Sequence, residues 1–96
     1  MRTSWLVAYD IANPGRLRRV CRLMLGYGDR VQYSVFRCVL SPRQRVWLET
    51  ELLDVLNQAD DQVMIVPLGA PDGVVERRIR TLGQPLKEAE RVCQVF

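Results

Sequence analysis

Two helix-start signals, each placed directly after an apolar stretch, constrain the fold of this chain more than any other feature of its sequence. Asn13-Pro14 and Ser41-Pro42 each put a side chain that caps a helix N-terminus before a proline in the first turn, and the second signal continues as a capping box. Residues 4–10 and 30–40, which precede the two signals, are rich in aromatic and β-branched side chains, as in strands. The chain therefore alternates predicted strands with predicted helices.

Each predicted helix carries one apolar face. In the first helix the apolar side chains recur at helical spacing, and the segment 26–29 ends it. The stripe consists of Leu17, Val20, Cys21, Met24 and Leu25. The second helix runs to about Leu56, and its predicted buried residues are Leu48, Leu52, Val55 and Leu56. Residues 30–40 are long for one strand, so we expect a tight reversal near Phe36 and Arg37.

The rest of the chain predicts one more core strand and an extended tail. Residues 63–66 form a buried strand closed by Pro67, 74–82 an edge strand and 91–96 a short terminal strand. The order β-α-β(β)-α-β in 96 residues predicts a single α+β domain over 1–96, a ferredoxin-like sandwich with its helices on one face of the sheet. We expect a homodimer with the tail, residues 74–96, at its interface.

Charge is divided unevenly along the chain. Residues 1–45 hold nine arginines against Asp10 and Asp29, whereas residues 46–96 hold more acidic than basic residues. Because a guanidinium group matches phosphate oxygens in a bidentate manner, this pattern favours a phosphate-bearing partner. The alternative, a solvated helix face, stays open at this point.

Several classes of chemistry are excluded or disfavoured. The chain contains no histidine, so acid–base catalysis by histidine and histidine ligation of metals are excluded. Three widely spaced cysteines match neither a disulfide framework nor a zinc pattern, and we expect buried, reduced thiols. No apolar run is long enough to span a bilayer, and the chain enters a strand at once without a signal-peptide pattern. We therefore expect a cytoplasmic protein without a membrane partner.

Carboxylate chemistry remains, and Asp10 is its best candidate. Asp10 ends the first predicted strand just before a helix start, where it could hold a hard divalent cation. The alternative is an aspartate that only stabilises the turn. One carboxylate is a poor metal site, but two copies across a two-fold axis make a better one. Asp60 and Asp61 are a rival pair, for which a solvated turn is the favoured interpretation.

Basic and aromatic side chains could flank Asp10 and contact a nucleic-acid backbone. For Phe36, core packing or a dimer contact is slightly favoured over nucleic-acid binding. The residues predicted on this ground to bind nucleic acid are Tyr9, Arg16, Arg18, Arg19, Arg22, Arg30, Phe36 and Arg37.

The run Tyr9-Asp10-Ile11, the arginine-bearing helix, the segment Arg30–Phe36 and the strand Asp61–Leu68 together resemble the Cas-two family of CRISPR-associated proteins. The resemblance covers residues 4–68 and is looser in the tail. It implies a ferredoxin-like homodimer in which Asp10 approaches its symmetry mate and holds Mg²⁺ or Mn²⁺, as metal ligand and catalytic residue. It also adds Ser34 to the predicted nucleic-acid-binding residues, because Ser34 matches a family position linked to activity or to the cleft around it. At the position of Arg37 the family commonly has an acidic residue. The arginine in this chain therefore makes its site more basic.

Three functional hypotheses follow. The first is a metal-dependent endonuclease acting on RNA or DNA. The second, which we favour, is an adaptor in spacer acquisition, a dimer that binds double-stranded DNA beside the Cas-one integrase and for which Asp10 is dispensable. The third is a ferredoxin-like RNA-binding or toxin-type ribonuclease domain outside CRISPR systems. Besides double-stranded DNA, single-stranded RNA is the other nucleic-acid partner that we consider.

Overall fold

The computed structural model describes residues 1–87 and Cys93, and its order of elements confirms the predicted alternation up to residue 69. The elements are β1 (Thr3–Asp10), α1 (Pro14–Leu25), β2 (Gly28–Gln32), β3 (Val35–Leu40), α2 (Pro42–Val55), β4 (Gln62–Gly69) and α3 (Gly73–Arg78).

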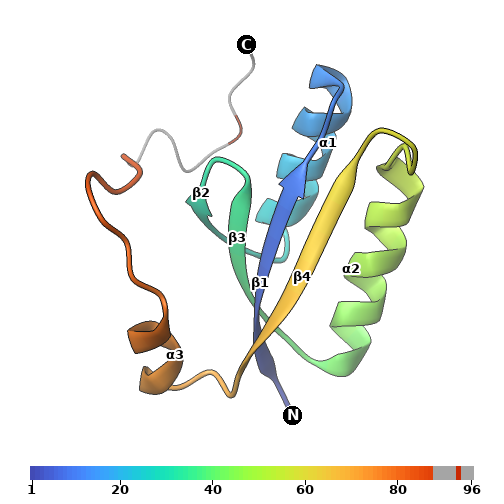
Figure 1. Ribbon diagram of the computed structural model, residues 1–96. Helices are drawn as coiled ribbons and strands as arrows, with labels where there is room; N and C mark the ends of the chain where they lie inside the picture. Colours follow the sequence, from blue (N-terminus) through green and yellow to red (C-terminus); the bar gives the residue numbers. More distant parts are fainter. Residues whose placement is uncertain (88–92, 94–96) are drawn as a thin grey trace.

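The four strands form one antiparallel sheet in the order β2-β3-β1-β4. β1 lies in the interior of the sheet and pairs with both β3 and β4. Figure 1 shows β1 passing in front of α1, with α2 beside β4. Side chains of α1 and α2 share one core cluster with those of β1 and β3, so both helices cover the same face of the sheet. The opposite face carries neither of these helices, and we call it the open face. This arrangement is the ferredoxin-like α+β sandwich predicted from the sequence.

Both predicted helix starts are confirmed in atomic detail. The Asn13 side chain accepts a hydrogen bond of 3.0 Å from the backbone N–H of Arg16, which satisfies one of the free donors at the start of α1. At the start of α2 the Ser41 hydroxyl accepts from the backbone of Gln44, and the Gln44 side chain accepts in return from the backbone of Ser41. Local sequence therefore sets where each helix begins.

The core lies between the sheet and the two helices, and alternation along the strands selects its residues. Every second residue of β1 and β3 points at the helices, and α1 and α2 contribute the facing side chains. The largest fully buried side chains in this layer are Val7, Val20, Met24, Phe36, Cys38 and Leu48. Leu17 and Leu25, predicted to lie in the apolar stripe of α1, remain 41% and 39% exposed at its margins.

Two predictions about backbone path are wrong. The chain reverses at Tyr33 and Ser34, not near Phe36 and Arg37, because Phe36 must stay in the regular ladder of β3 to reach the core. Residues 74–82 do not form an edge strand. The Asp72 carboxylate instead accepts a hydrogen bond of 2.9 Å from the backbone N–H of Val74 and caps the short helix α3.

The prediction of three reduced thiols is also wrong. Cys21 of α1 and Cys93 form a disulfide, whereas Cys38 is a free, buried thiol. The two half-cystines are 72 residues apart in the chain and only the tertiary fold brings them together. The predicted terminal strand 91–96 lies outside the described residues, except for Cys93, which is in neither a helix nor a strand.

Candidate nucleic-acid interface

Asp10 lies at the end of β1 and on the open face of the sheet. Val7 and Tyr9 point toward the helices, so Leu6, Ala8 and Asp10 point the other way. Asp10 is exposed and stands opposite Gln62 of β4 in the strand register. The carboxylate therefore occupies the rim of the open face, beside the start of α1.

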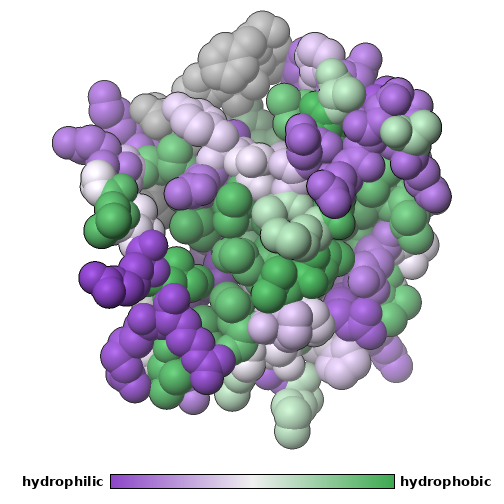
Figure 2. All heavy atoms as spheres, viewed as in Figure 1, coloured by the Kyte–Doolittle hydropathy of each residue, from purple (hydrophilic) through white to green (hydrophobic). Residues whose placement is uncertain are grey.

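The open face itself is apolar at its centre. Ala8 lies between Val35 and Met64 in the strand register, and Leu6 lies next to Val66. The Met64 side chain is 55% exposed. Figure 2 looks onto this face and shows apolar side chains gathered over the middle of the sheet, with hydrophilic side chains around them. A contiguous apolar surface of this kind is typical of a protein–protein interface.

The β2–β3 turn is held against β1 through the carbonyl oxygen of Tyr33. It accepts hydrogen bonds from the Tyr9 hydroxyl at 3.3 Å and from Nε and Nη2 of Arg30 at 3.0 and 2.7 Å. The Arg30 guanidinium also lies over the Tyr33 ring, 5.2 Å from its centroid. Tyr9 and Arg30, both predicted to bind nucleic acid, thus position this turn within the subunit.

Ser34 lies in the β2–β3 turn and is hydrogen-bonded to the strand that ends in Asp10. Its carbonyl oxygen accepts a hydrogen bond of 3.0 Å from the backbone N–H of Tyr9, the neighbour of Asp10. Tyr9 is buried, and burial raises the pKa of its hydroxyl while the charge of Arg30 opposes that rise. Tyr9 therefore stays neutral in the physiological range and acts as a hydrogen-bond donor.

Phe36 has no exposed surface, and its ring packs 6.2 Å from that of Tyr9, measured between centroids. In this conformation it cannot touch a bound nucleic acid, so the nucleic-acid-binding prediction for Phe36 is not supported. The alternative interpretation that we slightly favoured, core packing, describes its position.

Three arginines line the side of α1 that faces away from the core. Arg18 and Arg22 are four residues apart and share one side, and Arg19 is three residues from Arg22. Arg19 and Arg22 are exposed, and Arg18 is half-buried. No acidic residue lies within α1 itself, so this surface carries concentrated positive charge. We call these three residues the arginine face.

Arg16 lies apart from the arginine face. Its Nε and Nη2 donate to the two carboxylate oxygens of Asp61 at 2.7 and 3.1 Å. The Asp61 side chain has no exposed surface, and it also accepts from the backbone of Ala12 and Asn57. The Arg16 guanidinium holds the pKa of the Asp61 carboxyl well below its usual range. The expectation of a solvated turn is therefore wrong for Asp61, and the geometry does not support Arg16 as a phosphate-binding residue.

Sequence reasoning missed this Arg16–Asp61 bond because 45 residues separate the two side chains. No local signal indicates this bond: Arg16 lies just inside the start of α1, and Asp61 lies just before β4, the strand that pairs with β1.

Arg37 lies on the open face, between Asp29 and Leu6 in the strand register. Leu6 precedes Asp10 by four residues of extended strand, which separates Arg37 from the rim by about 13 Å along β1. The structure therefore does not place Arg37 beside Asp10. It also places Arg37 on a different surface from the arginine face.

A single subunit offers little for a metal ion. Among residues 1–87 and Cys93 no group of three or more acidic or cysteine side chains converges. Mg²⁺ is commonly bound through one or two carboxylates, with water and phosphate oxygens as the other ligands. Asp10 alone would supply one such carboxylate, and a symmetry-related Asp10 would supply the second. In the part of the chain that the structure describes, no helix is long and apolar enough to cross a membrane.

The four-stranded antiparallel sheet with α1 and α2 on one face defines a small ferredoxin-like α+β protein. Residues 2–72 match the model of the family described as CRISPR associated protein Cas2. The chain thus belongs to the Cas2 family, the family that its motifs resemble.

Relatives and solved structures agree with this assignment. The chain is 36% identical over 93 residues to a CRISPR-associated endoribonuclease Cas2 of Rhodospirillum rubrum, covering 97% of this chain and 90% of the relative. It is 44% identical over 68 residues to one from Thermodesulfovibrio yellowstonii, covering 71% and 75%. The crystal structure of Streptococcus pyogenes Cas2 superposes with a TM-score of 0.75 at 34% identity, covering 83% of this chain and 99% of that one.

Proposed function

We propose that two copies of this chain form a dimer through their open faces and hold double-stranded DNA by its phosphate backbone, beside the Cas-one integrase, during spacer acquisition. The observation that carries this proposal is the arginine face, Arg18, Arg19 and Arg22, which projects from the layer opposite the open face. A dimer built through the open faces turns both arginine faces outward, where a duplex can contact them. Arginine contacts of this type bind backbone phosphates without reading sequence.

The open face supports the dimer. A chain of 96 residues buries a modest core, and covering the apolar centre of its sheet adds apolar burial. Two identical faces related by a two-fold axis give a self-complementary contact. The exposed side chain of Met64 and its neighbours Ala8 and Leu6 are the centre of this contact in the proposal.

In this dimer Asp10 would lie near the Asp10 of the other copy. Because it lies on the rim of the open face, a two-fold axis through that face can bring two Asp10 carboxylates toward each other. Together they would hold Mg²⁺ or Mn²⁺, with Asp10 as ligand. Such an ion, when bound, polarises a phosphoryl group and lowers the pKa of a bound water. The chain itself supplies the ligands, and the arginine face supplies charge for flanking phosphates.

The second candidate function is endoribonuclease activity on single-stranded RNA. It is favoured by the relatives from Rhodospirillum rubrum and Thermodesulfovibrio yellowstonii, which are named endoribonucleases. The chain has few groups that could act as general acid or base in efficient hydrolysis, since it has no histidine and Asp10 is the rim carboxylate of each subunit. We therefore place the adaptor role first. Membership of the Cas2 family leaves no support for a toxin-type domain outside CRISPR systems.

A spacer-acquisition assay in cells with three variants separates the candidates. The first variant reverses the arginine face (Arg18→Glu, Arg19→Glu, Arg22→Glu), and the second is Asp10→Asn. Arg43→Glu on α2 is the matched control, because Arg43 is an exposed arginine on the other helix. Each purified variant is also tested for Mg²⁺-dependent cleavage of single-stranded RNA, and its fold is checked by circular dichroism.

The adaptor role predicts that reversing the arginine face abolishes acquisition while Asp10→Asn and Arg43→Glu retain it. The endoribonuclease role predicts that Asp10→Asn abolishes cleavage of RNA by a folded protein. If the reversed arginine face supports acquisition at the level of Arg43→Glu, the adaptor proposal is wrong. If Asp10→Asn cleaves as fast as the unmodified chain, hydrolysis at Asp10 is wrong.

A further inference from the structure

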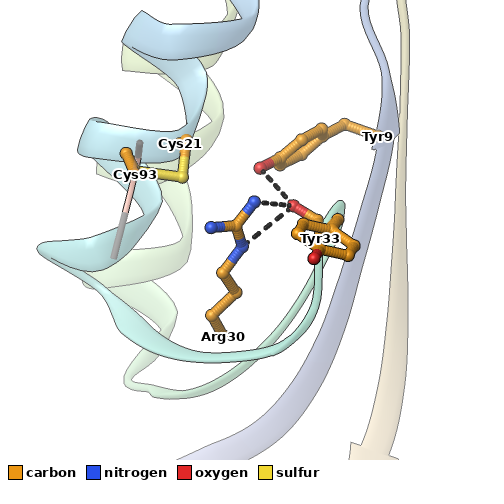
Figure 3. The surroundings of a disulfide bond; sticks show 5 residues. All are labelled: Tyr9, Cys21, Arg30, Tyr33 and Cys93. Carbon is orange, nitrogen blue, oxygen red and sulfur yellow. Dashed lines mark hydrogen bonds between the residues drawn. A yellow bond between two sulfur atoms is a disulfide. The ribbon is translucent and has the colours of Figure 1, made fainter. Parts of the chain in front are cut away.

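The disulfide between Cys21 and Cys93 joins the C-terminal segment to the helix layer. Cys21 lies in the middle of α1, and Cys93 follows α3 by 15 residues. Their Cα atoms are 5.9 Å apart. Figure 3 shows the bond beside α1, with Arg30, Tyr9 and Tyr33 in its surroundings. The segment is therefore attached on the helix side of the sheet, near the turn that Arg30 holds.

Apart from this bond, the described part of the segment has few attachments. Residues 79–87 form neither helix nor strand, and all are exposed except Ile79 and Leu86, which are half-buried. Cys93 itself packs against the core from the outside. A segment with few buried contacts and without a backbone ladder has low local stability. The covalent bond to Cys21 is thus the strongest described attachment of residues beyond Arg78.

The third cysteine does not compete for this bond. Cys38 points into the core from β3 and has no exposed surface. Burial raises the pKa of its thiol to about 11, with a smaller contribution from Asp29, so its reactive thiolate form is scarce. Cys21 is 4% exposed and Cys93 is half-buried, which makes the sulfur of Cys93 the more accessible end of the pair.

We propose that Cys21 and Cys93 form a reversible redox site whose state decides where the C-terminal segment lies. In the oxidised state the disulfide holds the segment on α1 of its own subunit. In the reduced state Cys93 and the described residues 79–87 lose this attachment and can move away from α1. This inference does not depend on the proposed function.

The reaction partner is a low-molecular-weight thiol–disulfide couple such as glutathione. A thiolate attacks the sulfur of Cys93, the bond to Cys21 breaks, and Cys21 leaves as a thiolate that takes up a proton. A second small thiolate attacks the small-molecule sulfur of this mixed disulfide. The small disulfide forms, and Cys93 leaves as a thiolate that takes up a proton. In total two small thiols are oxidised to one disulfide, and the protein disulfide is reduced to two thiols. The reverse sequence oxidises the protein.

The first measurement counts thiols. The full-length protein is equilibrated with glutathione at several ratios of reduced to oxidised form, denatured, alkylated and weighed by mass spectrometry. We expect one alkylated thiol, Cys38, in the oxidised protein and three in the reduced protein, with one transition between them. Three thiols in excess oxidised glutathione, or a mixed disulfide as the end product, would overturn the proposal.

The second measurement tests the release of the segment. A low dose of trypsin cleaves after exposed basic residues, and Arg80 and Lys87 lie in the segment. We expect cleavage at these two sites to be at least tenfold faster in the reduced than in the oxidised protein. Cys93→Ser should be cleaved at the reduced rate under both conditions, and the control Cys38→Ala should keep the redox dependence. Equal rates for oxidised and reduced protein would show that the disulfide does not control the segment.

Discussion

Replacement of Phe36 by alanine tests whether this residue serves the core or a bound nucleic acid. The side chain has no exposed surface and packs in the layer between β3 and the helices, with Tyr9 as an aromatic neighbour. Phe36→Ala removes the ring and leaves a cavity that the surrounding side chains fill only in part. The structure therefore predicts a loss of folding stability and no direct effect on the binding of phosphates.

The expected loss is about 3–5 kcal/mol, the range for a fully buried phenylalanine. Domains of this size have total stabilities of about 5–15 kcal/mol, so the variant keeps a folded state but a much weaker one. With a urea dependence of about 1–3 kcal/mol per molar, the unfolding midpoint should fall by roughly 2 M.

Urea unfolding followed by tryptophan fluorescence measures this shift, since Trp5 packs against the core and reports its opening. All samples should be fully oxidised and at one protein concentration, because the disulfide and any dimer contribute to stability. Tyr33→Ala is the matched control: its ring is 58% exposed, and the carbonyl oxygen that holds the turn is retained. We expect it to cost less than about 1 kcal/mol.

The reasoning is refuted if Phe36→Ala unfolds within about 1 kcal/mol of the unmodified chain yet binds DNA much more weakly. That result would mean that Phe36 turns outward to contact nucleic acid, as the predicted site assumed.

Three other predictions concern the Arg16–Asp61 ion pair, the disulfide and the arginine face. Because Arg16 lowers the pKa of Asp61, the stability that this ion pair gives the folded protein is complete above an ordinary carboxyl pKa of about 4 and is lost as pH falls further. Asp61→Asn should therefore remove this pH-dependent contribution from melting temperatures measured between pH 2 and 7. An unchanged dependence of melting temperature on pH would count against the pair. Cys93→Ser should lower the stability of the oxidised protein by up to about 4 kcal/mol, from the closure of a 72-residue loop, while leaving the reduced protein unaffected; calorimetry under both conditions measures it. Arg18→Gln should reduce the magnitude of the slope of log binding constant against log salt concentration by about 1 in a titration with duplex DNA, because the variant neutralises one phosphate fewer. A slope equal to that of the unmodified chain would exclude Arg18 from the interface.

Local sequence was sufficient for the parts of this protein that depend on neighbours in the chain. The caps at Asn13 and Ser41 were predicted from residues within one helical turn, and the structure confirms them. Alternation in the strands identified the face of β1 that packs on the helices. The element order then admitted few arrangements, so the ferredoxin-like sandwich could be predicted from the sequence.

The site was predicted less completely, because the roles of its residues depend on which side chains and carbonyl groups they contact in the folded chain. Composition indicated arginines for phosphate, but it could not show that Arg16 would be bonded to Asp61. Nor could it show that Arg30 would hold the carbonyl oxygen of Tyr33 instead of pointing to a ligand. The position of Asp10 on the rim was predicted, and its role stays a prediction.

What the sequence alone determined is the order of strands and helices up to residue 69 and the identity of Asp10 as a strand-end carboxylate, since both follow from local backbone preference and periodic burial. What only the tertiary structure decided is which arginines face outward, which turn joins β2 to β3, and that Cys21 meets Cys93. The Arg16–Asp61 and Cys21–Cys93 contacts join residues 45 and 72 positions apart in the chain, and the β2–β3 turn is held by Tyr9, 24 positions from Tyr33, so no local pattern determines these outcomes.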